Sequence, residues 1–353
     1  MLRIMFNRTY ATGAHVISML RDNPSGCPVQ VVGTHADPDS PVLAACDEAY
    51  PEPPEDVVGA DYVEWALAFT AEHRIDVLVP RLNSADLADA RADFAAAGVA
   101  LVAPPGDAIR LFHDKAAAYA DAAQRGLPVP PYRVVTTSAE LRAAVAELTP
   151  VSPQLCIKPV SGVAGAGYRR LTTSGPTMAE LLGHVDAFET VERYCAALDA
   201  STAGTASGED DQPGVPPLIV LPYLTGPEVT VDCLGDLDGT LLAAIGRTKG
   251  RRRRRIVDDS PARAVARALL AAHRMSFLSN VQVRYWRGPD DEQPLPYLLE
   301  VTTRMSGGLF MTALTGLNLP WAAVQLALGR DVHLPTPEFD ISFTPVSSIV
   351  RLG

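Results

Sequence analysis

The chain has 353 residues, of which 47% are hydrophobic and 20% charged, and its net charge is -11 at pH 7. This length predicts two or three domains or subdomains rather than one small core. No apolar run is long enough to span a membrane, and the acidic balance argues against nucleic-acid binding by phosphate neutralisation. The five cysteines never form a CxxC pair and the N-terminus lacks a signal-peptide core, which together predict a cytoplasmic protein without disulfides or zinc.

The first part of the chain alternates between short apolar runs and helical patterns. Buried strands are predicted at Leu2–Phe6, Val29–Gly33, Ile75–Pro80 and Val99–Ala103. Helices are predicted near Gly13–Arg21, Asp61–His73 and Ser84–Ala97. Strands separated by helices of this length are typical of βαβ units. The sequence therefore predicts an N-terminal α/β domain with a parallel sheet over residues 1–106.

The rest of the chain, residues 107–353, reads as a second, mixed region. Its first half is predicted as helix Asp107–Arg125, helix Ser138–Leu148, strand Gln154–Pro159, a glycine loop, strand Tyr168–Leu171 and helix Thr177–Thr190. The polar, proline-rich stretch 199–217 predicts a flexible surface loop. An antiparallel part follows, with strands Leu218–Leu224, Glu228–Leu234 and Leu241–Arg247, a helix at about Pro261–Met275, the hairpin Val281–Trp286 and Tyr297–Val301, and helices near Leu309–Thr315 and Leu319–Leu328.

A lysine and a glycine-rich loop follow one of the predicted strands. The segment QLCIKPVSGVAGAGYRR delivers Lys158 on an apolar strand and then offers Gly162, Gly165 and Gly167. Glycines let backbone N–H groups turn toward an anion, and lysine adds a point charge that suits phosphate. A hairpin tip with a solvated lysine explains the same pattern about as well. Lys115, early in the preceding helix, would by itself be taken as a solvated side chain.

Polar residues at strand ends form a second group. Glu228 opens a strand beside the turn Thr225–Pro227, where it could accept hydrogen bonds from ligand hydroxyls or simply be an exposed charge. If the runs SNVQVRYW and YLLEVTTRMSGG pair as a hairpin, Gln282 and Glu300 could point the same way. Amide and carboxylate oxygens suit Mg²⁺, and Arg304 would stand where phosphoryl charge needs neutralising. A buried Glu300–Arg304 ion pair is the rival interpretation.

These pieces, in this order and spacing, resemble the ATP-grasp superfamily, most closely the branch of carbamoyl phosphate synthetase and biotin carboxylase. The resemblance extends over most of the chain and implies an ATP-grasp fold for residues 107–353, with a lid subdomain at about 128–224. It implies that Lys115 and Lys158 hold ATP phosphates and that the loop Ser161–Gly167 closes over them. It also implies that the backbone of Leu221, Tyr223 and Leu224 lies beside adenine and that Glu228 binds ribose.

For the metal and the reaction, the resemblance implies that Gln282 and Glu300 ligate Mg²⁺, with two ions expected and Mn²⁺ as a possible substitute. Arg304 would steady an acyl-phosphate transition state, together with Glu300 and Lys158 as catalytic groups. Two positions depart from the family pattern. Thr302 replaces a metal-binding asparagine, so either its hydroxyl ligates the metal or the second ion is held less tightly or through water. Leu221 replaces a frequent glutamate, which removes a side-chain contact to adenine.

A basic run, GRTKGRRRRRI, interrupts the acidic chain at residues 246–256. In the family that the chain resembles, the loop at this place reaches the active site. The hypothesis is that Arg247 and Lys249, with part of the run, face substrate carboxylate or phosphates. For most of Arg251–Arg255 a solvated basic loop is the simpler interpretation. Arg81, Asn83 and Ser84 follow a predicted strand and are further candidates for the acceptor pocket, although a helix N-cap explains the latter two.

The resemblance implies an ATP-dependent enzyme that phosphorylates a carboxylate and then lets an amine displace phosphate, forming an amide or peptide-like bond. Its expected partners are a small carboxylate and a small amine, with neither nucleic acid nor membrane. A carboxylase or carbamoyl-type enzyme that uses bicarbonate is the second interpretation, and a non-catalytic nucleotide-binding relative is the third. Homodimers are common among such enzymes, and the sequence leaves this point open.

Overall fold

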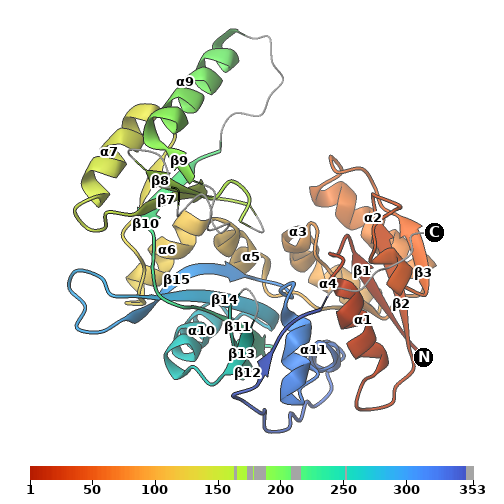
Figure 1. The fold of residues 1–353 in the computed structure, drawn as a ribbon. Coiled ribbons are helices and arrows are strands. Elements are labelled where there is room, and N and C mark those ends of the chain that lie inside the picture. Colours follow the sequence, from red (N-terminus) through yellow and green to blue (C-terminus); the bar gives the residue numbers. More distant parts are fainter. Residues whose placement is uncertain (163–164, 173–177, 179–187, 208–215, 251–252, 347–353) are drawn as a thin grey trace. The chain divides into compact units, whose positions relative to one another are not determined.

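The computed structural model describes residues 1–353 except 163–164, 173–177, 179–187, 208–215, 251–252 and 347–353 (Figure 1). The chain forms two compact units. Unit 1 comprises Met1–Phe112, Glu228–Val283 and Glu300–Gly353, and unit 2 comprises His113–Pro227 and Arg284–Leu299. Compactness is a different criterion from independent folding, so the domains predicted at residues 1–106 and 107–353 remain predictions.

Unit 1 begins with a five-stranded parallel sheet in the order β3-β2-β1-β4-β5. Its strands are β1 (Leu2–Asn7), β2 (Val29–His35), β3 (Glu48–Pro51), β4 (Val77–Val79) and β5 (Ala100–Leu101). The connections contain α1 (Gly13–Arg21), η1 (Leu43–Ala45), α2 (Gly59–Glu72), α3 (Ser84–Asp89) and α4 (Arg91–Ala96), and α5 (Gly106–His113) follows β5. From β1 the strands proceed first to one side and then, from β4, to the other. The carboxyl ends of β1 and β4 therefore flank the point where the strand order reverses, which is where ligands bind in open α/β sheets.

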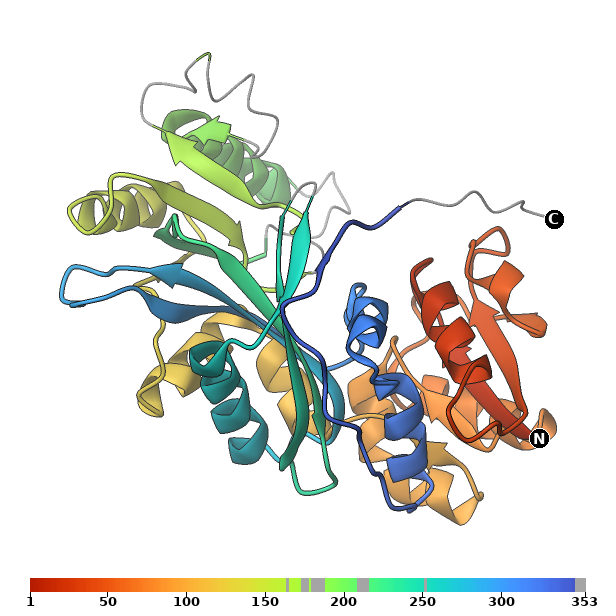
Figure 2. The same cartoon turned by 60° about the horizontal axis from the view of Figure 1, so that its bottom comes forward.

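A six-stranded sheet follows in the order β15-β14-β11-β12-β13-β16. Its strands are β11 (Glu228–Gly235), β12 (Leu241–Thr248), β13 (Arg254–Val257), β14 (Phe277–Trp286), β15 (Leu295–Thr302) and β16 (Ser342–Phe343). Side chains alternate between the faces of a strand. Helix α10 (Ser260–Ala272) lies along β11 and β12 (Figure 2). The apolar residues Val229, Val231 and Cys233 of β11 thus alternate with Thr230 and Asp232, which lie on its other face.

Unit 2 contains a sheet in the order β6-β10-β7-β8-β9. Its strands are β6 (Arg133–Val135), β7 (Leu155–Pro159), β8 (Arg169–Thr172), β9 (Phe188–Thr190) and β10 (Leu218–Pro222), and its helices include α6 (Lys115–Gln124), α7 (Ser138–Leu148) and α9 (Val191–Ser207). Helix α7 begins with a capping box in which Thr137 and Glu140 each bond the other's backbone N–H. The buried residues Leu141, Cys195 and Leu198 join α7 and α9 to this sheet in one core.

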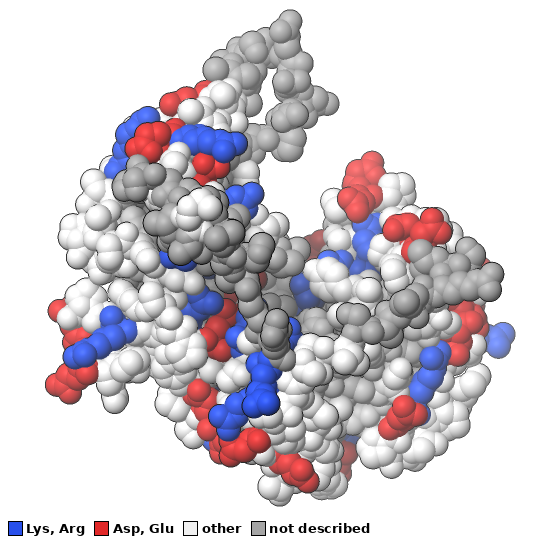
Figure 3. Space-filling model, viewed as in Figure 1, with Lys and Arg blue, Asp and Glu red and all other residues white. Residues whose placement is uncertain are grey.

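Charged side chains on the surface are intermingled rather than separated by sign. In Figure 3, lysine and arginine neighbour aspartate and glutamate over the visible described surface. Exposed ion pairs such as Arg133–Glu147 and Arg274–Asp238 account for part of this pattern. Such pairs contribute only about 0–1 kcal/mol each. The charged groups that bear on chemistry are therefore sought among the buried ones.

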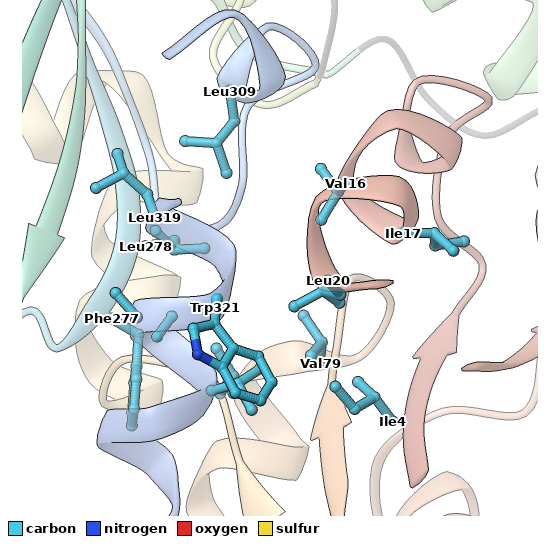
Figure 4. Close-up of a cluster of buried hydrophobic side chains, with 14 of the residues drawn as sticks. Ile4, Val16, Ile17, Leu20, Val79, Phe277, Leu278, Leu309, Leu319 and Trp321 are labelled. Atoms are coloured by element: carbon cyan, nitrogen blue, oxygen red, sulfur yellow. The ribbon is translucent and has the colours of Figure 1, made fainter. Parts of the chain in front are cut away.

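A hydrophobic core in unit 1 joins the N-terminal sheet to the C-terminal helices η2 (Leu309–Thr315) and α11 (Leu319–Ala327). Figure 4 shows its side chains, which include Ile4, Val16, Ile17, Leu20, Val79, Phe277, Leu278, Leu309, Leu319 and Trp321. The Trp321 Nε1 donates to the Ser25 hydroxyl at 3.1 Å. Asn318 caps α11 by accepting from the Trp321 N–H, and its amide donates to the Met19 carbonyl at 2.6 Å. This packing fixes the segment after β15 against α1.

The structure departs from the sequence predictions in unit 2. Helix α9 runs to Ser207 and so includes the first part of the predicted loop 199–217, of which residues 208–215 lie outside the described residues. The spacing of the buried Val191, Cys195 and Leu198 is helical, which explains why a helix forms there. The helix predicted at Thr177–Thr190 lies mostly outside the described residues, and its end, Phe188–Thr190, is strand β9. The short strands β3, β13 and β16 were not predicted, and of these β3 and β16 lie at the edges of their sheets.

Among the described residues, no single helix has the length and hydropathy of a membrane span. Only the bent pair formed by η2 and α11 has that length and hydropathy when its two helices are counted together.

Candidate functional site

Lysine is rare in this chain. Of its 30 lysine and arginine residues, only Lys115, Lys158 and Lys249 are lysines. In unit 2, Lys115 is the first residue of α6 and is only 9% exposed. Its Nζ donates to the Gly162 carbonyl at 3.0 Å, and its backbone N–H donates to the Val160 carbonyl. The first predicted lysine therefore lies directly against the glycine loop.

Lys158 lies on β7 of the same unit, where a buried run delivers it to the end of the strand. Its Nζ is 3.2 Å from the Tyr119 hydroxyl and 3.3 Å from the Leu299 carbonyl. The Tyr119 hydroxyl donates to that same carbonyl at 2.9 Å. The Tyr119 hydroxyl and the Leu299 carbonyl thus orient the ammonium group at this end of β7.

The glycine loop adopts backbone conformations that suit glycine. Gly162, Gly165 and Gly167 have φ values of 127°, 72° and 74°. At Gly167, an added Cβ would lie only 2.7 Å from the Pro159 ring, so the loop approaches the end of β7 too closely for any side chain. The central residues 163–164 lie outside the described residues. Ser161 precedes this part and is half-buried.

The segment predicted to lie beside adenine runs antiparallel to β7. Leu221 is fully buried on β10, opposite Cys156. Beyond the strand, the Tyr223 N–H donates to the Gln154 carbonyl at 2.8 Å, and the Leu224 carbonyl accepts from Arg284 at 3.2 Å. Two of the backbone groups expected to serve adenine therefore already have partners within the protein.

In unit 1, Glu228 begins β11 and is buried, with 9% of its surface exposed. Its Oε1 accepts from the Lys249 Nζ at 2.9 Å, whereas the Lys249 side chain is 63% exposed. The carboxylate is thus fixed from one side by an accessible lysine. This pair brings together two residues that the sequence analysis assigned separately to ribose and to substrate phosphates.

A buried polar network lies on the face of β11 that carries Thr230 and Asp232, which by alternation is also the face of Glu228. Asp232 on β11 is fully buried, and its Oδ2 accepts from the Arg247 Nε on β12 at 2.6 Å. Its Oδ1 accepts from the Asn280 amide at 2.8 Å and from the Ser306 hydroxyl at 2.7 Å. The Thr230 hydroxyl is also bonded to Asn280. Every oxygen of the carboxylate is therefore satisfied, as a buried charge requires.

This network holds the turn that follows β15. Arg247 donates to the Ser306 hydroxyl at 3.4 Å, and its guanidinium fills the place where a Cβ at position 308 would lie, 2.7 Å away. Gly308 is therefore required by the close approach of Arg247. The structure places Arg247 in a buried ion pair, 5% exposed, and its described contacts are with the protein's own side chains.

The predicted metal ligands lie on neighbouring strands of the sheet. Gln282 lies between the buried Val281 and Val283 on β14 and is half-buried. Glu300 and Thr302 are half-buried residues on either side of Val301 on β15. The described residues hold no cluster of three or more His, Cys, Asp or Glu side chains. One carboxylate with an amide and a hydroxyl fits Mg²⁺, which needs few protein ligands because it keeps waters and phosphate oxygens.

Arg304 lies just beyond β15. Its two terminal nitrogens donate to the Met305 carbonyl at 3.1 Å and to the Tyr10 hydroxyl at 3.2 Å. Within the part of the chain that the structure describes, it forms no ion pair, so the expected rival, a Glu300–Arg304 salt bridge, is absent there. Burial lowers the pKa of the Arg304 guanidinium, and the nearby charge of Arg81 acts in the same direction.

Of the five consecutive arginines Arg251–Arg255, the structure describes Arg253–Arg255. Arg254 and Arg255 begin strand β13. Arg254 donates to the Met311 sulfur at 3.4 Å, and Arg255 pairs with Asp340 at 3.1 Å as an exposed ion pair. Residues 251–252 lie outside the described residues. The described part of the run is thus partly committed to contacts within unit 1.

Sequence reasoning missed three residues that shape this unit. Asp232 and Asn280 were available from the alternation of polar and apolar residues on β11 and β14, which marks a polar sheet face. Tyr10, which touches Arg304, lies in the loop after β1 and carries no sequence signal that links it to a residue nearly three hundred positions away.

Comparisons with known proteins give one family model that matches part of the chain and several solved structures of similar fold. Residues 214–349 match a family model described as ATP-grasp in the biosynthetic pathway with Ter operon. A comparison with curated protein sequences gives no match. The structure resembles the biotin carboxylase domain of Hydrogenobacter thermophilus 2-oxoglutarate carboxylase, with 16% identity and a TM-score of 0.63, covering 96% of this chain and 73% of that one. That domain is described as a dimer in complex with MgADP, ADP and bicarbonate.

Two further structures are similar over nearly the whole chain. One is N5-carboxyaminoimidazole synthetase from Staphylococcus aureus complexed with ADP, at 12% identity and a TM-score of 0.65, covering 95% of this chain and 80% of that one. The other is biotin carboxylase from Campylobacter jejuni, at 15% identity and a TM-score of 0.62, covering 95% and 74%. At such identities the likeness establishes the fold, and activity is a separate question.

Proposed function

We propose that this protein, whose fold is that of the ATP-grasp superfamily, is an ATP-dependent carboxylate–amine ligase. The predicted resemblance and fold class are confirmed by the matched family model and by the structural neighbours. The proposal concerns the reaction: a carboxylate oxygen attacks the γ-phosphorus of ATP, giving an acyl phosphate and ADP. An amine then adds to the acyl carbon, phosphate leaves, and the amine nitrogen loses a proton.

Lys115 and Lys158 are proposed to bind the ATP phosphates, with Lys158 also near the adenine, and the loop Ser161–Gly167 to cover them. Support comes from the direct contact of Lys115 with Gly162 and from the Tyr119 hydroxyl and Leu299 carbonyl, which orient Lys158 at the end of β7. Excluding water in this way protects an acyl phosphate from hydrolysis. Glu228 is proposed to bind the ribose, held in place by Lys249.

Gln282, Glu300 and Thr302 are proposed to hold Mg²⁺, which would neutralise charge on the transferring phosphoryl group. The observation that carries the proposal is that these oxygen donors lie on neighbouring strands within the segment that matches the family model, and that Glu300 and Thr302 directly precede Arg304. Arg304 is proposed to stabilise the transition state. Arg247 we assign to positioning, since its described contacts orient the Ser306–Gly308 turn.

A bicarbonate-dependent carboxylase is the second candidate. It is favoured by the described ligands and names of the neighbours, which include a bicarbonate complex and an N5-carboxyaminoimidazole synthetase. In that case bicarbonate would take the place of the organic carboxylate in the first step. A homodimer is also proposed, because one neighbour is described as a domain dimer, and light scattering of the purified chain tests it.

The deciding experiment measures phosphate release from Mg–ATP across pools of small carboxylates, each with and without pools of amines, and with bicarbonate alone. Release that needs both a carboxylate and an amine supports the ligase. Release with bicarbonate alone moves the assignment to the carboxylase. Binding of ATP without release in any pool contradicts both.

Two variants make this assay specific. Glu300→Gln keeps the size of the side chain but replaces the proposed metal-binding carboxylate with a neutral amide, and we expect it to abolish release. Glu292→Gln removes an exposed carboxylate from the connection between β14 and β15 and should leave release unchanged. Equal loss in both variants would show that charge or stability, rather than metal binding, limits the reaction.

A further inference from the structure

Unit 1 contains a pocket at the point where the order of the N-terminal sheet reverses. The loop after β1 contributes Tyr10 and Thr12, the loop after β4 contributes Arg81, and the segment after β15 contributes Arg304 and Gly307. The pocket therefore combines the usual ligand location of an open α/β sheet, beyond the carboxyl ends of the strands where their order reverses, with the residue that we propose to stabilise phosphoryl transfer.

Two guanidinium groups share one aromatic ring in this pocket. The Arg81 guanidinium lies 3.7 Å from the centroid of the Tyr10 ring, and that of Arg304 lies 5.1 Å from it. The Tyr10 hydroxyl also accepts from Arg304. Cation–π contacts of this kind fix the orientation of a guanidinium without neutralising it.

Arg81 is anchored on one side only. Its Nη1 donates to the Arg8 carbonyl at 2.7 Å, and its backbone N–H donates to the Asn7 side chain at 2.6 Å. Its Nε is buried and has no hydrogen-bond partner. A buried donor left without an acceptor is costly, at about 1–3 kcal/mol, and such groups call for an explanation.

These two half-buried arginines differ from the buried arginines of the same unit. Arg8 is paired with Glu52 and Arg247 with Asp232. In the described chain, by contrast, neither Arg81 nor Arg304 has a carboxylate partner. Glu52 carries charge near Arg81, but it is held by Arg8 and by the Tyr62 hydroxyl. Two like charges are thus held near one ring, and an anion would relieve both the repulsion and the unmet donor.

We propose that Arg81 and Arg304 together bind the carboxylate group that receives the phosphoryl group, and that Arg81 determines specificity for this substrate. The inference rests on the proposed ligase function and extends it to a residue of the N-terminal sheet. A planar guanidinium fork matches a carboxylate better than a point charge does. Tyr10 holds both forks, so the carboxylate is oriented before reaction rather than captured by flexible side chains.

The test measures anion binding directly and needs no turnover. The probe is malonate, a small dicarboxylate, titrated into the full chain while the unfolding temperature is recorded, with sodium chloride at equal ionic strength as reference. Phosphate is titrated in a parallel arm, and ATP affinity is measured separately. We expect malonate to stabilise the wild type more than chloride or phosphate does, because a ligand that binds only the folded state raises its stability.

Arg81→Met is expected to weaken malonate binding at least tenfold, as the loss of a charge-assisted hydrogen-bonded contact implies, and to leave ATP affinity unchanged. Arg21→Met, which removes a half-exposed arginine of α1 paired with Asp47, is the matched control and should bind malonate normally. Tyr10→Phe keeps the ring and should retain most binding. Because Arg81→Met removes a repulsion, its unfolding temperature without anion should equal or exceed that of the wild type.

Several results would overturn the proposal. The first is that malonate does not raise the unfolding temperature of the wild type, or raises it less than phosphate does. The second is that Arg81→Met binds malonate as tightly as the wild type does. The third is that Arg81→Met has a lowered affinity for ATP. If Arg81→Met unfolds at a lower temperature without anion, Arg81→Lys, which retains the charge, must restore malonate binding or the role is structural. Arg81-dependent malonate binding without any phosphate release would keep this pocket and reject the ligase.

Discussion

Arg247 and Arg304 lie in the same unit and contribute to the same turn, yet their surroundings are opposite. Arg247 is 5% exposed and forms a 2.6 Å ion pair with a fully buried aspartate. Arg304 contacts a carbonyl, a tyrosine hydroxyl and the face of a ring, and in the described chain it has no carboxylate partner. The charge of Arg247 is neutralised by a directly bonded carboxylate, whereas Arg304 is influenced by the Glu300 charge without forming an ion pair with it.

This difference separates structural from chemical roles. A buried ion pair can be close to neutral in its net contribution to stability, although removing one partner is strongly destabilising. A buried cation without a partner costs free energy in the folded state and persists where a ligand uses it. The comparison therefore predicts that replacing Arg247 affects folding first, whereas replacing Arg304 affects reaction first.

The largest expected effect comes from Arg247→Met. It leaves Asp232 buried with an uncompensated charge, which costs about 3–5 kcal/mol of unfolding free energy. Denaturant titration followed by circular dichroism measures this change. The double variant Arg247→Met with Asp232→Leu should recover most of the loss, because neither charge then remains. A single variant as stable as the wild type would show that the pair contributes little and that our distinction is wrong.

Arg304→Met should act on the reaction instead. Losing one donor to developing negative charge typically lowers the rate about 10²–10³-fold, whereas we expect the free energy of unfolding to change by less than about 1 kcal/mol. Phosphate release under saturating ATP and the denaturation midpoint are measured on the same preparation. A variant that loses stability but keeps its rate per folded molecule would place Arg304 in the structural class with Arg247.

Most of the fold could be predicted from the sequence because the strong periodic signals are local. Apolar runs such as Leu2–Phe6 are buried on both faces of a parallel sheet, and the alternation on β11 reflects a sheet with one apolar face. The edge strand β3 could not be predicted, since its four residues are only half-buried or exposed and gain strand structure from pairing with β2.

The sequence predicted which kinds of ligand the candidate site binds, but it did not predict which residues contact one another there. The order of lysine, glycine loop, Glu228, Gln282 and Glu300 indicated phosphate and metal binding without any distance. Arg247 was assigned to substrate because the loop at this place reaches the active site in the family that the chain resembles. The sequence near Arg247 does not reveal its partner, Asp232, which lies fifteen positions away. Which arginine is neutralised depends on strand pairing across β11 and β12, which local sequence does not specify.

Lys158 extends the comparison to a lysine that contacts the Tyr119 hydroxyl at 3.2 Å and the Leu299 carbonyl at 3.3 Å. Lys158→Met should raise the KM for ATP by about tenfold to a hundredfold, the range expected for one charged hydrogen bond of about 1.5–3 kcal/mol. Lys158→Arg tests why lysine is retained in an arginine-rich chain: a wide planar fork should fit poorly where a compact charge is needed. Isothermal titration with a non-hydrolysable ATP analogue measures the nucleotide affinity of both variants, and the phosphate-release assay gives their KM. Unchanged affinity in the two variants would remove Lys158 from the nucleotide site.

The smallest effect is expected at Arg255, an exposed arginine of the basic run. It pairs with Asp340, and the two side chains are 51% and 79% exposed. Such pairs contribute about 0.2–1 kcal/mol, so Arg255→Met should barely shift the denaturation midpoint. Phosphate release should also stay within about twofold of the wild type, because surface charges away from bound ligands act weakly through solvent. A fall in phosphate release comparable to that of Arg304→Met would mean that the basic run reaches substrate during the reaction. Exposure alone would then not distinguish arginines that act on substrate from arginines with a structural role.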